Sequence, residues 1–174
     1  QHLPTDLLHY LLPSRYCQSD QLSALAAFIV GDALPNYLQI AKIRTWIHHH
    51  IRYEAGSSDS STSALEIVNS KRGVCRAFAQ LGIALCRAIN VPARMVVGFL
   101  HQLKPMDLHA WFEAFIGGRW FTFDATEDVT RGNRIVVAYG RDAADVALAT
   151  LFGAFTMTNM KITVTAVSPQ PVLR

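Results

Sequence analysis

Three residues have the types and surroundings that nucleophilic catalysis needs: Cys75, His109 and Asp124. Cys75 follows Gly73 and Val74 at the predicted start of a long helix. Unpaired backbone N–H groups and the positive end of the helix dipole favour the thiolate there. The same N–H groups could stabilise an oxyanion when the sulfur attacks a carbonyl, and Gly73 would let a substrate approach closely. The alternative is an unreactive cysteine that packs as a small apolar side chain.

His109 and Asp124 lie at the outer ends of two predicted strands, 110–116 (AWFEAFI) and 120–124 (WFTFD). Gly117-Gly118 between them is a strong signal for a hairpin turn. Counting outward from this turn brings the two residues nearly opposite one another. Side chains in such cross-strand positions are about 5 Å apart, close enough for a carboxylate to orient an imidazole. The alternative is a polar pair at the sheet end with no catalytic role.

The other two cysteines are predicted to lie in the core. Cys86 comes eleven residues after Cys75, about 16 Å along a straight helix. A disulfide needs Cα atoms within about 7 Å, so these two cannot pair. Cys17 and Cys86 therefore most simply fill apolar space.

Metal sites are weaker hypotheses. His48, His49 and His50 are consecutive, and consecutive helical side chains point about 100° apart, so they do not converge on one ion. A solvated helix end, where imidazoles meet the C-terminal dipole, explains them better. His101 and Asp107 could join His109 at a zinc ion, but no second ligand pair at metal spacing supports this.

The pattern of apolar residues places helices first and strands second. Helical periodicity or capping signals mark the stretches near 7–12, 19–31, 36–51, 63–70 and 74–89, and Gly56 to Ser63 forms a polar surface loop. Strand patterns cover 93–100, 110–116, 120–124, 134–138 and 161–167. This order predicts a single α+β domain over residues 1–174 with an antiparallel sheet.

Composition excludes several classes of function. The 174 residues are 51% hydrophobic and 17% charged, with a net charge of +3. Basic residues are scattered, so nucleic-acid binding is not expected. No apolar run approaches the roughly 18 residues of a membrane span, and no signal-peptide pattern opens the chain. Three cysteines without a CxxC pattern favour a reducing, cytoplasmic setting. Oligomeric state is not indicated.

Two stretches carry a family resemblance: GVCRAFAQLGIALCRAINVPARMVVGF and DLHAWFEAFIGGRWFTFDAT. With their G-x-C, HAW and D-x-T motifs in this order, they resemble the transglutaminase-like superfamily, whose core is similar to papain-type cysteine proteases. LLPSRYCQSD and VAYGRDAADVA resemble the bacterial proteins of the group, so the likeness covers most of the chain.

The resemblance implies that Cys75 is the nucleophile, His109 the general base and Asp124 the orienting carboxylate. It also implies an oxyanion donor from a side chain upstream of the cysteine, for which the candidates are Tyr16, Trp46 and Tyr53. Trp111 is expected to lie in the core or in a groove wall.

In two respects the chain departs from the bacterial proteins that it resembles. They commonly have an acidic residue where this chain has Ala77, which puts a supporting contact in doubt. Many also carry a β-rich segment before the LLPSRY stretch, so this chain resembles their catalytic core alone.

The function that these residues predict is acyl transfer from a peptide or other amide through a thioester. Water as acceptor would make the protein a peptidase or amidase, which is the favoured interpretation. An amine acceptor would make it a transglutaminase, and a non-catalytic binding module is a third alternative. The chemistry requires no metal or organic cofactor.

Overall fold

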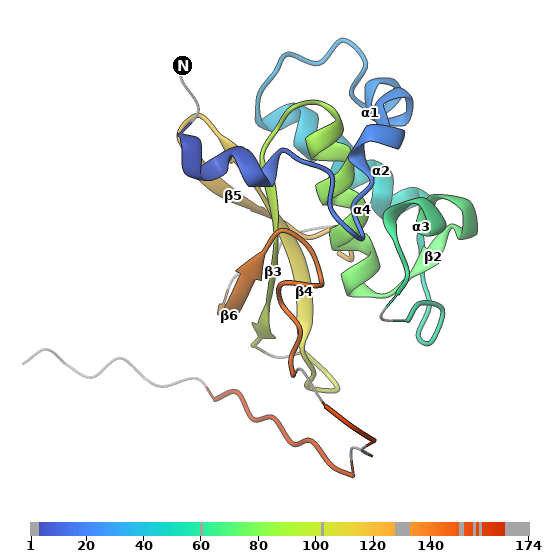
Figure 1. The fold of residues 1–174 in the computed structure, drawn as a ribbon, viewed down its shortest axis with the longest axis vertical. Helices are drawn as coiled ribbons and strands as arrows, with labels where there is room; N and C mark the ends of the chain where they lie inside the picture. Colours follow the sequence, from blue (N-terminus) through green and yellow to red (C-terminus); the bar gives the residue numbers. More distant parts are fainter. Residues whose placement is uncertain are drawn as a thin grey trace, which may run out of the picture.

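Helices form the first half of the chain and strands the second (Figure 1). The computed structural model describes residues 4–59, 61–101, 103–127, 133–149, 152–154, 156 and 158–165. Its helices are α1 (Ser23–Val30), α2 (Tyr37–His50), α3 (Ala64–Ser70) and α4 (Cys75–Ala88), and its main strands are β3 (Ala93–Leu100), β4 (His109–Ile116), β5 (Arg119–Phe123) and β6 (Arg134–Gly140). The prediction of an α+β fold is confirmed.

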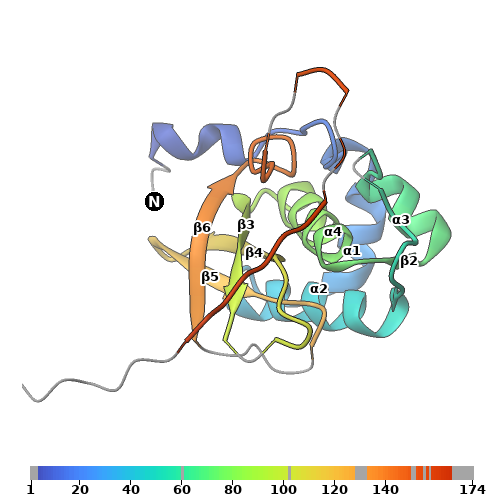
Figure 2. The same ribbon diagram turned by 90° about the horizontal axis from the view of Figure 1, so that it is seen from below.

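The main sheet is antiparallel, in the order β5-β4-β3-β6. The β4–β5 hairpin turns at Gly117 and Gly118, which both have positive φ, at 58° and 89°. A two-residue turn of this kind matches the twist of its strands and favours glycine. The helices gather on one side of the sheet (Figures 1 and 2). Four of the five predicted strands are thus found, with ends within two residues of prediction.

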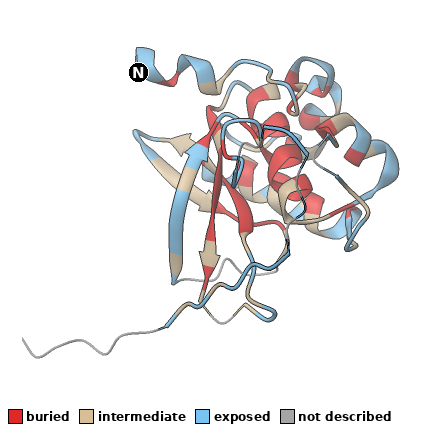
Figure 3. Cartoon of the chain, turned by 60° about the horizontal axis from the view of Figure 1, so that its bottom comes forward, coloured by how far each residue is buried: buried red, intermediate tan, exposed pale blue. Residues whose placement is uncertain are grey.

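The α4 helix is the centre of the core rather than a surface helix with one apolar face. Every residue from Ala77 to Arg87 is buried (Figure 3), because α4 packs on β3 and β4 and on all three other helices. Gly82 brings it close to the sheet: a Cβ there would lie 2.5 Å from the Phe112 ring on β4. The helical pattern over 74–89 therefore predicts the element but not the burial of every residue from Ala77 to Arg87.

A short parallel pair, β1 (Arg52–Tyr53) and β2 (Arg72–Gly73), was not predicted. It sets Tyr53 opposite Gly73, two residues before α4 begins. The polar stretch from Gly56 to Ser63 lies in the loop between β1 and α3, as predicted. The α3 helix begins with a capping box of Ser63 and Glu66. Two-residue strands carry too few side chains to show a periodicity.

At the N-terminus the structure differs from prediction in detail. The first apolar stripe forms a 3₁₀ helix, Thr5–Tyr10, in which only Leu7 is buried. A second 3₁₀ turn, Ser19–Gln21, precedes α1, so α1 begins later than the predicted stretch 19–31, with Leu22 as its N-cap residue.

The predicted strand 161–167 is wrong as far as the structure describes it. Residues 161–165 run as chain without strand pairing (Figure 2), and residues 166 and 167 lie outside the described part. Alternating side chains make a segment fit for a sheet, but a strand forms only where a neighbouring backbone accepts its hydrogen bonds. Among the described residues, no helix is both long and apolar enough to cross a membrane.

Candidate active site

Cys75 is the first residue of α4 and is a free, partly exposed thiol. Val74 before it is extended and makes no side-chain cap to the first N–H groups of the helix. The β1–β2 pair ends at Gly73 and fixes the direction from which the chain enters the helix. Backbone pairing therefore positions the sulfur.

His109 and Asp124 are joined by a hydrogen bond of 2.8 Å between Nε2 and Oδ2, and both are buried. His109 begins β4, and Asp124 follows the last residue of β5. The hairpin register pairs Phe112 with Phe123, so the two residues are diagonal neighbours rather than directly opposite. The structure thus brings together the two side chains that the hairpin argument linked.

The Asp124 carboxylate has three further donors. Oδ1 accepts from the Thr126 backbone N–H at 3.1 Å and from its hydroxyl at 2.7 Å. Oδ2 accepts from Nη1 and Nη2 of Arg134, each at 3.2 Å. Burial raises the pKa of Asp124, but the hydrogen bonds and charges of His109, Thr126 and Arg134 outweigh it and lower the pKa to about 2. The group is therefore a carboxylate across the physiological pH range.

Opposing effects also act on His109. Burial disfavours the imidazolium, but hydrogen bonds to Asp124 and Cys75 and the charges of both groups outweigh it and raise the pKa of His109 to about 9. At neutral pH the ring is then an imidazolium that contacts a carboxylate on one side and the cysteine on the other. This arrangement can hold a thiolate and supply a proton.

Two side chains of α2 form hydrogen bonds with backbone carbonyl groups of the turn after β5. Arg44 Nε donates to the Asp124 carbonyl at 3.0 Å, and His48 Nδ1 lies 3.0 Å from the Ala125 carbonyl. His48 therefore docks on the turn, while His49 and His50 are exposed as a solvated helix end would be. Sequence reasoning had no signal for these long-range contacts.

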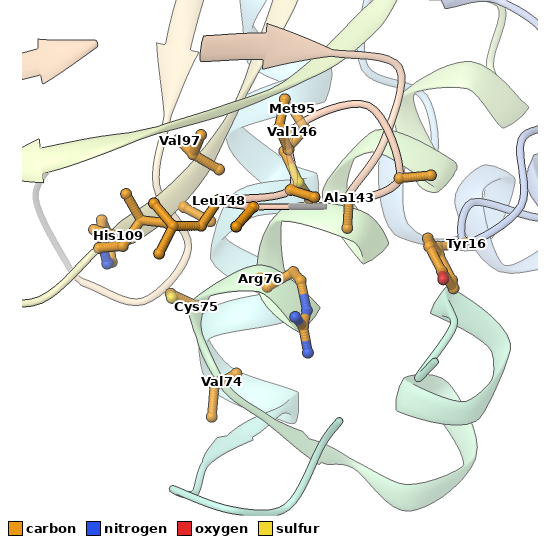
Figure 4. Close-up of a pocket in the computed structure, with 15 residues that line it drawn as sticks. Tyr16, Val74, Cys75, Arg76, Met95, Val97, His109, Ala143, Val146 and Leu148 are labelled. Carbon is orange, nitrogen blue, oxygen red and sulfur yellow. The ribbon is translucent and has the colours of Figure 1, made fainter. Parts of the chain in front are cut away.

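Cys75 and His109 lie where two hollows meet. One, the apolar hollow, has a volume of about 510 Å³ and is walled by Met95, Val97 and Ala110 of the sheet and by residues 143, 144 and 146–149 (Figure 4). The other, the charged hollow, has a volume of about 620 Å³, and Tyr53, Lys104, Asp107 and Glu127 are among its lining residues. Both share Val74, Cys75, Leu108 and His109.

The three candidate oxyanion donors occupy different places. The Tyr53 hydroxyl oxygen accepts a hydrogen bond from the Cys75 backbone N–H, and burial, followed by the charge of Cys75, raises the pKa of Tyr53. Tyr16 lines the apolar hollow across the opening from Cys75 (Figure 4). Trp46 stacks on His50 with ring centroids 4.4 Å apart and lines neither hollow.

Gly73 and Trp111 serve packing in this structure. Gly73 is buried, and a Cβ there would collide with the Cβ of Ala77, so its small size lets β2 approach α4. Trp111 is 1% exposed, stacks near His109 with centroids 6.2 Å apart, and carries the Arg134 guanidinium over its ring at 4.8 Å. Neither residue is among those that line the two hollows.

No group of three or more His, Cys, Asp or Glu residues is arranged to hold a metal ion within the described ranges. His101 and Asp107 therefore form no ligand set with His109 there.

The sequence model of the Transglutaminase-like superfamily matches residues 23–125, a stretch that includes Cys75, His109 and Asp124. An uncharacterized protein of Mycobacterium leprae is 31% identical over 147 residues, covering 79% of this chain and 52% of that protein. Human kyphoscoliosis peptidase is 25% identical over 117 residues, covering 60% of this chain and 18% of that protein.

Among solved structures, a proposed cysteine protease from Cytophaga hutchinsonii is 47% identical with a TM-score of 0.84. The match covers 87% of this chain and 53% of that one. The chain thus spans about half the length of the bacterial relatives it matches.

Proposed function

Because the chain belongs to the transglutaminase-like superfamily, we propose that it is a cysteine-dependent enzyme that cleaves amide bonds with Cys75, His109 and Asp124. The observation that carries the proposal is the chain of contacts from Cys75 to His109 to Asp124, at the junction of two hollows. A nucleophile, a base in contact with it and a group that orients the base are the parts of a catalytic triad.

The reaction begins with the Cys75 thiolate and the His109 imidazolium. The sulfur attacks the amide carbonyl and forms a C–S bond, and the carbonyl electrons move to oxygen. When the oxyanion collapses, the C–N bond breaks and His109 gives its proton to the leaving amine. The thioester that remains is attacked by water, which His109, now neutral, deprotonates. Release of the acid restores the thiolate and the imidazolium.

The oxyanion needs donors beside the sulfur. The Cys75 backbone N–H and the Tyr53 hydroxyl lie next to one another, and in the proposed mechanism both donate to the oxygen that becomes negative there. Since the pKa of Tyr53 is raised, by its burial first and then by the charge of Cys75, its hydroxyl keeps the proton that it would donate. Tyr53 is therefore the oxyanion donor that we propose among the three candidates.

Hydrolysis is the outcome that we propose, with water as the acceptor. The names of two relatives, a proposed cysteine protease and a peptidase, support it. An amine acceptor would use the same three residues and make the protein a transglutaminase.

The test is amide cleavage by the purified chain on a library of end-blocked peptides, with the Cys75→Ala variant as blank. We expect new amines to appear with the wild type and none with the variant. Addition of a fluorescent primary amine measures the competing reaction, since an amine-accepting enzyme would attach it to the acyl product. A chain that neither cleaves nor attaches, over the whole library, would be the non-catalytic module instead.

A further inference from the structure

The two hollows that meet at Cys75 differ in the side chains that line them. In the apolar hollow, the described lining residues other than Cys75 and His109 are aliphatic except for Tyr16 and Arg76. The Arg76 guanidinium donates to the Asp59 carbonyl on the helical side, and in Figure 4 it lies away from the sheet wall. The side chains of Met95, Val97 and Leu148 therefore form an apolar wall.

Small side chains give the apolar hollow its width. Four of the lining residues in the segment that covers it are alanines, at positions 143, 144, 147 and 149. Val146 of the same segment is buried and anchors it to the core, while Leu148 is 55% exposed and lies near Val97 and His109 (Figure 4). A volume of about 510 Å³ lies within the range of cavities that bind small molecules and side chains.

The charged hollow also begins at Cys75 and His109, but most of its other lining residues come from different segments of the chain. Lys104 and Asp107 come from the loop between β3 and β4, and Glu127 follows the turn that carries Asp124. A carbonyl carbon at the Cys75 sulfur therefore lies between a hollow with an aliphatic wall and a hollow that three charged side chains help to line. A substrate that fills both must continue on both sides of its reactive bond.

We propose that the substrate is an internal peptide segment with a bulky apolar side chain within two residues of the cleaved bond, which occupies the apolar hollow. This inference rests on the proposed function, because it takes Cys75 as the attacking atom. An extended chain advances about 3.3 to 3.6 Å per residue, so only the nearest residues can reach a hollow whose rim is Cys75 and His109. Charged or polar side chains on the other side of the bond face the charged hollow.

The test separates binding from cleavage. End-blocked peptides that carry Leu, Phe, Ser or Asp at each of the two positions on either side of the bond are titrated into the Cys75→Ala variant by calorimetry. The same peptides are offered to the wild type for cleavage. We expect Leu and Phe at one position to bind about tenfold more tightly than Ser or Asp, as burial of one such side chain implies.

Leu148→Asp is the decisive variant, since this exposed side chain can change without harm to the core. Introduced beside Cys75→Ala, it should remove the preference for Leu and Phe. Leu34→Asp is the matched control, because Leu34 is 73% exposed and lines neither hollow; it should keep the preference.

Equal affinity for all four side chains at every position would overturn the inference, as would an unchanged preference in Leu148→Asp. Cleavage by the wild type without any apolar preference would refute the inference and leave the proposed function standing. Selective binding that Leu148→Asp abolishes, without Cys75-dependent cleavage, would support the inference on binding and refute the proposed reaction.

Discussion

Arg134 directs both terminal nitrogens of its guanidinium to the carboxylate oxygen of Asp124 that also bonds His109. Arg134 opens β6, which pairs with β3 and not with the hairpin that carries the other two residues. Its side chain is 10% exposed and lies over the Trp111 ring. A side chain of the edge strand β6 thus binds the carboxylate of the proposed triad. We expect Arg134 to act as a positioning residue for Asp124.

Arg134→Gln should lower kcat about tenfold or more with little change in KM, since a buried charged hydrogen bond to Asp124 is lost. Burial raises the pKa of Asp124 and the charge of Arg134 lowers it. Without that charge the pKa should rise, and the acid limb of the pH–rate profile should move to higher pH. A merely structural role would not move that limb. The matched control is Arg94→Gln, because Arg94 also pairs with a carboxylate, Glu113, at 2.7 Å, but outside the site. Equal effects of the two variants would contradict the assignment.

Asp124→Asn should leave the shape of the site and remove the negative charge that holds the imidazolium. The pKa of the alkaline limb of the pH–rate profile should then shift from about 9 toward 6.5, the ordinary pKa of histidine. At pH 7, kcat should drop about a hundredfold or more. The measurement is kcat/KM between pH 5 and 10 for both proteins. An alkaline limb that stays at 9 in the variant would show that Asp124 does not set the state of His109.

The raised pKa of His109 also makes stability depend on pH. Its folded value of about 9 exceeds the 6.5 of an unperturbed ring, so its contribution is complete below 6.5 and is lost as the pH rises through 9. Denaturant unfolding should therefore show a larger loss of unfolding free energy between pH 7 and 10 in the wild type than in His109→Gln.

Other groups act in the same direction, among them Cys17 and Cys86, and are held constant in that comparison. Burial raises the pKa of Cys17 to about 12 and raises that of Cys86 further, so both thiols ionise more readily in the unfolded chain at high pH. Both remain in His109→Gln. If wild type and variant lose equal stability, the histidine is not charged in the folded protein at pH 7.

Thiol labelling distinguishes reactivity from exposure. Iodoacetamide at pH 7 should modify Cys75 first, since Cys17 and Cys86 are fully buried. His109→Gln leaves Cys75 accessible but removes its cationic partner, and the labelling rate should fall about tenfold or more. An unchanged rate in this variant would mean that access alone governs the reaction.

Tyr53→Phe tests the proposed oxyanion donor. Loss of one such donor costs about a hundredfold in kcat, and KM should hardly change because the bond strengthens only as charge develops. Trp46→Phe is the control among the three aromatic candidates, since Trp46 lines neither hollow. A full effect of the control, or none in Tyr53→Phe, would assign the role elsewhere.

Local signals account for what the sequence could predict. A glycine before Cys75, a helical pattern after it and a Gly-Gly turn midway between His109 and Asp124 are each readable over a few residues. The contacts of Asp124 with Arg134 and Arg44 join elements that no local pattern connects, so the sequence could not predict them. The same holds for residues 161–165, whose alternation is real but which pair with no described strand.

The close approach of Gly82 to the Phe112 ring has a consequence for evolution. Cys75 is carried by α4 and His109 by β4, and Gly82 and Phe112 lie on those same two elements. The distance between Cys75 and His109 therefore depends in part on how closely α4 approaches β4 at Gly82, which has no side chain. A methyl group there would push α4 away from β4, so in the proposed mechanism a substitution that touches none of the three catalytic candidates would lower activity.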